Sequence, residues 1–157
     1  MHTLPALKNM TAQATRAYPV LALGLLLSAC SGTPPTNLGV HQGHLTSCPT
    51  SPNCVSSQAT DSEHQIAPLP LSGDPAQSRA RLLSLLANQP RAKVVAQQDN
   101  YLRAEFTSQI MRFVDDVEFL IGPQAIEVRS ASRLGRSDFG VNRERVEQLR
   151  QQLSHPE

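Results

Sequence analysis

The stretch that decides the fold is residues 101–132, YLRAEFTSQIMRFVDDVEFLIGPQAIEVRSAS. Apolar and polar side chains alternate along much of it, and a period of two is typical of β-strands that bury one face. The alternating segments are 101–108, 114–121 and 125–132. Gly122-Pro123 marks a turn between the last two, and a shorter strand is expected upstream at 93–97. The sequence therefore predicts an antiparallel meander of about four strands.

Amphipathic helices are predicted on both sides of the meander. Asp74-Pro75-Ala76-Gln77 combines an N-cap, a proline at the first helical position and a capping-box glutamine. Apolar side chains then recur at helical spacing until Asn88-Gln89-Pro90 ends the helix. A second helix is expected over 143–153, with Asn142 as its N-cap. This order of elements predicts a two-layer α+β domain with both helices packed on one face of the sheet.

Length and composition exclude several classes of protein. The chain has 157 residues, enough for one domain and tails, and a formal net charge of +1. Aromatic residues make up 4% and tryptophan is absent, so little is available for stacking on nucleic-acid bases or sugars. No nucleic-acid partner is therefore expected. The sequence contains no complete catalytic or metal-binding motif, so we expect no cofactor or metal, and the balance leans against an enzyme.

The first 29 residues have the organisation of a secretory signal peptide. Residues 1–17 carry Lys8 and Arg16 and no acidic residue, and residues 18–29 are uncharged and largely apolar. As a helix, this apolar run would span about 18 Å, too short for a hydrocarbon core of about 30 Å. It ends in Leu27-Ser28-Ala29-Cys30, which resembles the lipobox of bacterial lipoproteins. The resemblance implies cleavage before Cys30 and lipidation of that cysteine, whereas the alternative is a buried helix with a chance cysteine.

A lipidated Cys30 implies a periplasm-facing protein that is held on a membrane of the bacterial cell envelope by its acyl chains. Ser31 follows the cysteine, where lipoproteins of the Gram-negative inner membrane typically have aspartate. For a Gram-negative source this favours the outer membrane. The expected partners are the membrane itself and either an envelope protein or a small anionic ligand.

The remaining chain divides into a tether, a domain and a short tail. Residues 30–47 are expected to form a flexible tether, because they are rich in Gly, Pro and hydroxyl residues and lack apolar periodicity. His41 and His44 lie in this segment, but two histidines alone lack the further ligands of a metal site. The single domain is expected over 48–153 and the tail over 154–157.

Cys48 and Cys54 are expected to form a local disulfide, since paired cysteines are the simplest state in an exported protein. Free or metal-binding thiols are the alternative. The C-x5-C spacing lacks the C-x-x-C pattern of redox motifs, and a structural zinc site needs four ligands.

Three stretches together resemble one family. They are Cys48–Ser57, Arg112–Phe119, and Val128–Arg133 continuing into Ser137–Arg143. The chain resembles the domain of unknown function 1499 family over about residues 45–153. The resemblance implies an uncharacterised domain found in bacterial envelopes and chloroplasts, and it brings no known activity or catalytic residue. Arg136 departs from the pattern, because an aromatic residue is expected at that position.

Charged and polar residues of the meander and of the loop after it form a candidate cluster. Arg103, Glu105, Glu118, Glu127 and Arg129 share an outward face, which we expect to be solvated and to carry cross-strand ion pairs. The candidate cluster comprises Asp115, Asp116, Glu118, Arg129, Arg133, Ser137, Asp138, Asn142 and Arg143. One interpretation is a pocket for a small anion, because arginine suits carboxylates and phosphates. The other is a structural ion-pair network that holds the loop 130–142 against the sheet.

Overall fold

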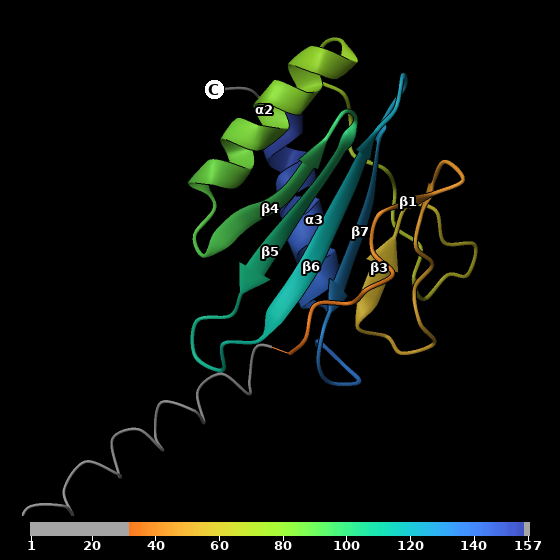
Figure 1. Ribbon diagram of the computed structural model, residues 1–157, viewed down its shortest axis with the longest axis vertical. Coiled ribbons are helices and arrows are strands. Elements are labelled where there is room, and N and C mark those ends of the chain that lie inside the picture. The colour runs from red at the N-terminus through yellow and green to blue at the C-terminus, as the bar shows by residue number, and fades with distance from the viewer. Residues whose placement is uncertain (1–31, 156–157) are drawn as a thin grey trace, which may run out of the picture. The chain divides into compact units, whose positions relative to one another are not determined.

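The central sheet has five strands; in Figure 1 the C-terminal helix, in blue, lies behind it and the other helix, in green, lies at its upper left. The computed structural model describes residues 32–155, so the predicted signal peptide, Cys30 and residues 156–157 of the predicted tail lie outside the described residues. The strands are β3 (Cys54–Ser56), β4 (Ala92–Gln98), β5 (Tyr101–Thr107), β6 (Val114–Ile121) and β7 (Ile126–Ser132). Their order across the sheet is β3-β7-β6-β5-β4, and all neighbours are antiparallel.

The predicted α+β fold is confirmed, and β4 to β7 form the expected meander. Strand β3 is an addition, because it joins the outer edge of β7 through the pair Val55↔Ser130. All of its residues are buried, so its sequence shows no alternation that would indicate a strand.

Both helices begin with a defined cap. Helix α2 (Pro75–Asn88) has the predicted capping box, in which the Gln77 amide donates to Asp74 Oδ1 at 2.8 Å. Helix α3 (Val141–Ser154) begins after Gly140, whose φ of 83° is left-handed. The prediction of Asn142 as N-cap was therefore wrong. Asp138 accepts hydrogen bonds from the amides of Gly140 and Asn142, so the cap function lies earlier in the loop.

The helices cover one face of the sheet, as predicted. Leu82 and Leu86 of α2 and Val146 and Leu149 of α3 pack in one core with the strands. The strand residues of this core include Leu102, Ala104, Val117, Phe119, Ile126 and Val128. Between residues 32 and 155, no helix is long and apolar enough to cross a membrane.

The segment before the disulfide covers the opposite face of the sheet. We name residues 32–49 the N-terminal strap; it includes the short hairpin of β1 (Val40–His41) and β2 (His44–Leu45). Leu45 is buried against Tyr101 and Leu120, and the Gly39 amide donates to Glu118 Oε1 at 2.7 Å. Figure 1 shows this orange segment running across the front of the sheet. The structure therefore differs from the expected flexible tether over these residues, because Leu45 and backbone groups are fixed to the sheet.

The strap also changes the environment of the face that was expected to be solvated. Glu118 and Arg129 are buried on that face, whereas Arg103, Glu105 and Glu127 are partly exposed. The expectation of a solvated face was thus wrong at its centre. The alternation of apolar and polar residues indicates which side chains share a face of the sheet. It does not show that a distant segment of the chain covers the polar face.

Candidate functional site

Glu118 lies at the centre of the polar face, fully buried beneath the strap. Its Oε1 accepts hydrogen bonds from the Tyr101 hydroxyl at 2.8 Å and from the Gly39 amide at 2.7 Å, and its Oε2 accepts from Arg129 Nη1 at 3.2 Å. Burial, reinforced by the negative charge of Glu118, raises the pKa of the Tyr101 phenol. The phenol therefore stays protonated and serves as a hydrogen-bond donor.

Asp116 and Arg133 form a second buried pair on the same face. Arg133 Nε and Nη2 reach the two carboxylate oxygens of Asp116 at 2.7 and 2.9 Å, which is the bidentate arrangement that arginine favours. Glu105 and Arg103 extend the pair, since Glu105 accepts from Arg133 and Arg103 donates to Asp116. The hydrogen bonds to Asp116 raise the pKa of the Arg133 guanidinium further above its ordinary value. The Nε and Nη2 groups of Arg133 are therefore both engaged by carboxylates.

Arg129 is engaged less completely than Arg133. Its side chain is only 7% exposed, and its single ion pair is the one to Glu118. Its buried Nε makes no hydrogen bond to any described residue. Arg129 lines a cavity of about 300 Å³ between strap and sheet, whose other lining residues include Pro35, Asn37, Ser47, Asp116 and Arg133. A guanidinium at the wall of this cavity favours a carboxylate or phosphate oxygen as ligand.

The opposite face carries a separate polar cluster around Asn142, which is fully buried. Asn142 Nδ2 donates to the Asn53 carbonyl, to Ser132 Oγ and to Asp138, while its Oδ1 accepts from Ser130 Oγ. These bonds fasten the loop 133–140 and the chain before β3 to the end of β7. For these residues the structure therefore favours a structural network over an anion pocket, the two interpretations that the sequence left open.

Arg145 completes this cluster, although it is not among the residues of the predicted cluster. Its Nη2 donates to Asp115 Oδ2 at 2.5 Å, its Nη1 donates to Asn142 Oδ1 at 2.8 Å, and its guanidinium carbon lies 4.9 Å from the centre of the Phe106 ring. Asp115 belongs to this side because neighbouring strand residues point to opposite faces. Arg145 lies next to the apolar Val146 in the sequence, so its contacts with Asp115 and Asn142 could be identified only from the packing of α3.

The structure thus divides the predicted nine-residue cluster between the two faces of the sheet. Asp116, Glu118, Arg129 and Arg133 lie on the strap side, and Asp115, Asp138 and Asn142 lie on the helix side. Arg143 belongs to neither group, since it donates to the carbonyls of Gln65 and Glu63. Ser137 is exposed, and its hydroxyl accepts from the Phe139 amide. The residues that the sequence missed on the strap side are Tyr101 and Gly39.

The cysteine prediction is confirmed by the disulfide between Cys48 and Cys54, with the Cα atoms 5.7 Å apart. Within residues 32–155, no group of three or more histidine, cysteine or acidic side chains is placed to hold a metal ion. His64 is buried and contacts Asp61 at 2.7 Å and the Ser51 carbonyl at 3.2 Å. His64 is thus part of the loop structure between β3 and α2.

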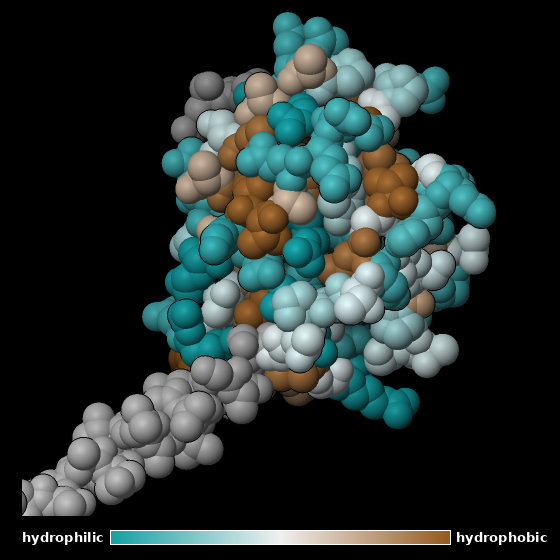
Figure 2. Space-filling view, viewed as in Figure 1, coloured by the Kyte–Doolittle hydropathy of each residue, from teal (hydrophilic) through white to brown (hydrophobic). Residues whose placement is uncertain are grey.

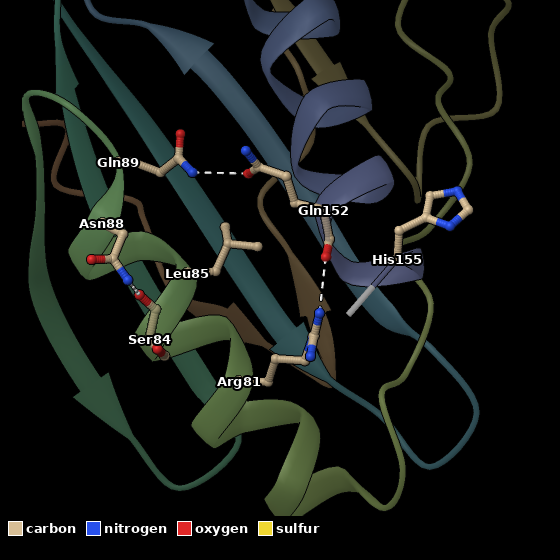
Figure 3. Close-up of a pocket in the computed structure, with 7 residues that line it drawn as sticks. All are labelled: Arg81, Ser84, Leu85, Asn88, Gln89, Gln152 and His155. Carbon is tan, nitrogen blue, oxygen red and sulfur yellow. Dashed lines mark hydrogen bonds between the residues drawn. The ribbon is translucent and has the colours of Figure 1, made fainter. Parts of the chain in front are cut away.

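A second cavity, of about 460 Å³, lies between the C-terminal halves of α2 and α3 (Figure 3). Gln152 bridges its walls, because its side chain accepts from Gln89 Nε2 at 2.8 Å and its carbonyl accepts from Arg81 Nη2 at 3.0 Å. Leu85 supplies the apolar surface that Figure 3 shows among amide and hydroxyl groups. This cavity has no carboxylate among its lining side chains and no buried ion pair. It therefore has fewer charged groups that could bind a ligand than the cavity on the strap side.

The strap-side arrangement is suited to binding rather than to nucleophilic catalysis. Ser47 and Ser132 line the cavity, and the hydroxyls of Ser132 and Ser130 are both hydrogen-bonded to Asn142. No described histidine contacts either hydroxyl, and the contacts of His64 are to Asp61 and Ser51. The site can hold an oxyanion beside Arg129, and the Arg133–Asp116 pair forms part of the wall of its cavity.

No curated protein and no solved structure matches the chain. The model of one protein family matches residues 44–153, which include the strands of the central sheet, both helices and the disulfide. This range agrees with the resemblance seen over about residues 45–153. The chain therefore belongs to the family described as a protein of unknown function, DUF1499.

Proposed function

We propose that the protein is a lipid-anchored binding module of the bacterial cell envelope, which takes a small carboxylate or phosphate ligand into the cavity between strap and sheet. The proposal has two separable parts. One is the anchoring of the chain through Cys30, and the other is the binding of an anion beside Arg129. Each part has its own test.

The anchoring part rests on the order of features before the domain. A basic segment, a short apolar run and Leu27-Ser28-Ala29-Cys30 follow one another in the order of a lipoprotein signal. The disulfide between Cys48 and Cys54 supports export, because disulfides persist in oxidising compartments such as the periplasm. The acyl chains would keep the domain on a membrane surface facing the periplasm.

The observation that carries the binding part is the Arg129 side chain, which lines a cavity of about 300 Å³ and makes one ion pair, to Glu118, among the described residues. The charged side chains that line this cavity are Asp116, Arg129 and Arg133, and the two arginines also pair with Glu118 and Glu105. A carboxylate or phosphate oxygen in the cavity would add a charge-assisted hydrogen bond to the Arg129 guanidinium. A volume near 300 Å³ is at the small end of ligand sites, which favours a compact ligand.

Thermal unfolding of the full chain in the presence of inorganic phosphate or succinate tests the binding part. We expect either anion to raise the Tm of the wild type, because a ligand that binds only the folded state stabilises it. Arg129→Lys keeps the charge but removes the Nε donor, so it should lose this response. Arg112→Lys, at an exposed position, is the matched control and should respond like the wild type. A response that is equally absent from all three proteins would mean that Arg129 and Glu118 form a structural pair only.

Mass spectrometry of the full-length protein extracted from its own membranes tests the anchoring part. We expect a chain that begins at Cys30 and carries acyl groups. An intact, unmodified N-terminus would contradict the anchoring. A retained small mass under native conditions would identify the ligand directly.

A further inference from the structure

We propose that the end of the domain from which the chain emerges at Gly32 docks on the lipid bilayer through apolar loop side chains. The inference rests on the anchoring part of the proposed function and adds a defined orientation on the membrane. Six of the seven large hydrophobic side chains that are exposed in residues 32–155 lie in two loops or at the start of the helix that follows the second loop. They are Ile110, Met111 and Phe113 in the β5–β6 loop, and Leu134, Phe139 and Val141 in and after the β7–α3 loop.

The two loops lie at the same end of the sheet. Strand β6 begins where β7 ends, because Asp115 pairs with Ser132 and the Arg133 amide donates to the Val114 carbonyl at 3.1 Å. Ser108 and Val141, one from each loop region, line a common cavity. Both loops lie at the lower end of the domain in Figure 1, and Figure 2 shows brown, hydrophobic atoms at this margin.

The described chain begins at this end. A methyl group added at Gly32 would lie 3.0 Å from Arg133 Cβ and 3.1 Å from Leu134 Cγ, so Gly32 packs directly on the β7–α3 loop. Cys30 precedes Gly32 by two residues, and two peptide units span at most about 7.6 Å between Cα atoms. An acyl group on Cys30 would therefore be joined to Gly32 by a short stretch of chain, which favours a position of this end of the domain near the bilayer.

The exposed side chains have the character of membrane-surface contacts. Phe139 is 97% exposed and Ile110 is 86% exposed, so neither contributes to the core. Arg112 and Arg136 lie exposed in the same loops, where they suit anionic lipid headgroups. The opposite end of the sheet differs, because its turns present Asp99, Asn100 and Gln124.

Depth measurement with single spin labels on the reconstituted lipoprotein tests this orientation. The full chain is extracted from membranes, labelled at Ile110→Cys or Phe139→Cys, and placed in vesicles of phosphatidylethanolamine and phosphatidylglycerol. Gln124→Cys, at the opposite end, is the control. Acylation of Cys30 and the disulfide leave the introduced cysteine as the free thiol. We expect the labels at 110 and 139 to be accessible to oxygen and shielded from a water-soluble nickel chelate, and the label at 124 to show the reverse.

Each outcome decides the proposal. Labels that are all accessible to the nickel chelate would overturn the docking, and the mass of the same sample would show whether Cys30 anchoring still stands. Labels at 110 and 139 that are shielded from both reagents would also overturn it, because a protein partner or a second copy would then cover this end. Shielding by lipid in a sample that lacks acylation would support the docking and contradict the anchor.

Discussion

Glu118 shows how strongly one residue ties the strap to the sheet. Its carboxylate accepts hydrogen bonds from Tyr101 on β5, Arg129 on β7 and the Gly39 backbone in the strap. A buried ion pair adds little net stability relative to an apolar replacement, since desolvation opposes the attraction. Removing one partner is different, because the other charge remains buried without compensation.

Glu118→Gln is therefore expected to lower the free energy of unfolding by about 3–5 kcal/mol. The neutral amide keeps the size of the side chain but leaves the Arg129 charge unpaired. Urea denaturation measures the loss. Glu63→Gln, at an exposed position whose side chain has no recorded hydrogen bond, is the control and should cost less than about 0.5 kcal/mol. Equal losses in the two variants would show that Glu118 is not ionised beside Arg129.

His64 gives a prediction for pH. Burial alone would lower the pKa of His64, but the hydrogen bond to the Ser51 carbonyl and the hydrogen bond and charge of Asp61 outweigh it and hold the pKa above 6.5. The folded protein then binds this proton more tightly than the unfolded chain does. The stabilisation is therefore fully present below pH 6.5 and is lost as the pH rises through the raised pKa of folded His64.

The free energy of unfolding, measured by urea titrations across this pH range, is expected to show this decline in the wild type. His64→Gln retains hydrogen-bonding groups but cannot titrate, so its decline should be smaller. Asp61→Asn should lie between the two, since it removes the charge but leaves the Ser51 contact. An identical pH dependence in wild type and His64→Gln would assign the effect to other groups.

Among the elements, the strap hairpin shows what pattern alone does not predict. β1 and β2 have two residues each, too short for a period to be visible, and only Leu45 of the pair Val40↔Leu45 is buried. The long meander strands were predicted to within a residue or two, because their alternation is repeated over seven or eight positions. Helix α2 was predictable from its capping box, whereas α3 starts in a loop whose cap depends on Asp138 and a left-handed Gly140.

Leu45→Ala is expected to lower the free energy of unfolding by about 2–5 kcal/mol, since it opens a cavity against Tyr101 and Leu120. Val40→Ala in the same hairpin is the matched control, because Val40 is 40% exposed. Hydrogen exchange gives a second measure. The Gly39 amide, which donates to Glu118, should lose protection in Leu45→Ala and keep it in Val40→Ala. Unchanged protection in Leu45→Ala would show that the Leu45 side chain is not needed to hold the Gly39 amide on Glu118.

At the scale of the whole molecule, the sheet is covered on both faces, by two helices on one and by the strap on the other. The sequence predicted the helix face from periodicity and the family from its motifs, and both are confirmed. It could not predict which arginine pairs with Asp115 and which with Asp116. These partners, Arg145 and Arg133, come from different elements that only the tertiary fold brings together. The sequence left open whether the polar face has a structural or a binding role. The burial of Arg129, whose Nε has no partner among the described residues, follows only from the tertiary structure that includes the strap.

The disulfide joins these layers. Cys54 opens β3 at the edge of the sheet, where it pairs with Ala131, and Cys48 lies in the strap beside the Arg129 cavity. Closing a loop of this length is expected to stabilise the fold by about 2.4 kcal/mol in the chain-entropy model. The double variant Cys48→Ala/Cys54→Ala should therefore unfold at lower urea concentration, by about that free energy. Because the strap also forms one wall of the cavity, the variant should respond less to phosphate in the thermal assay. A variant with unchanged stability would show that β3 and the strap are held without the disulfide, and its stability would then not depend on export to an oxidising compartment.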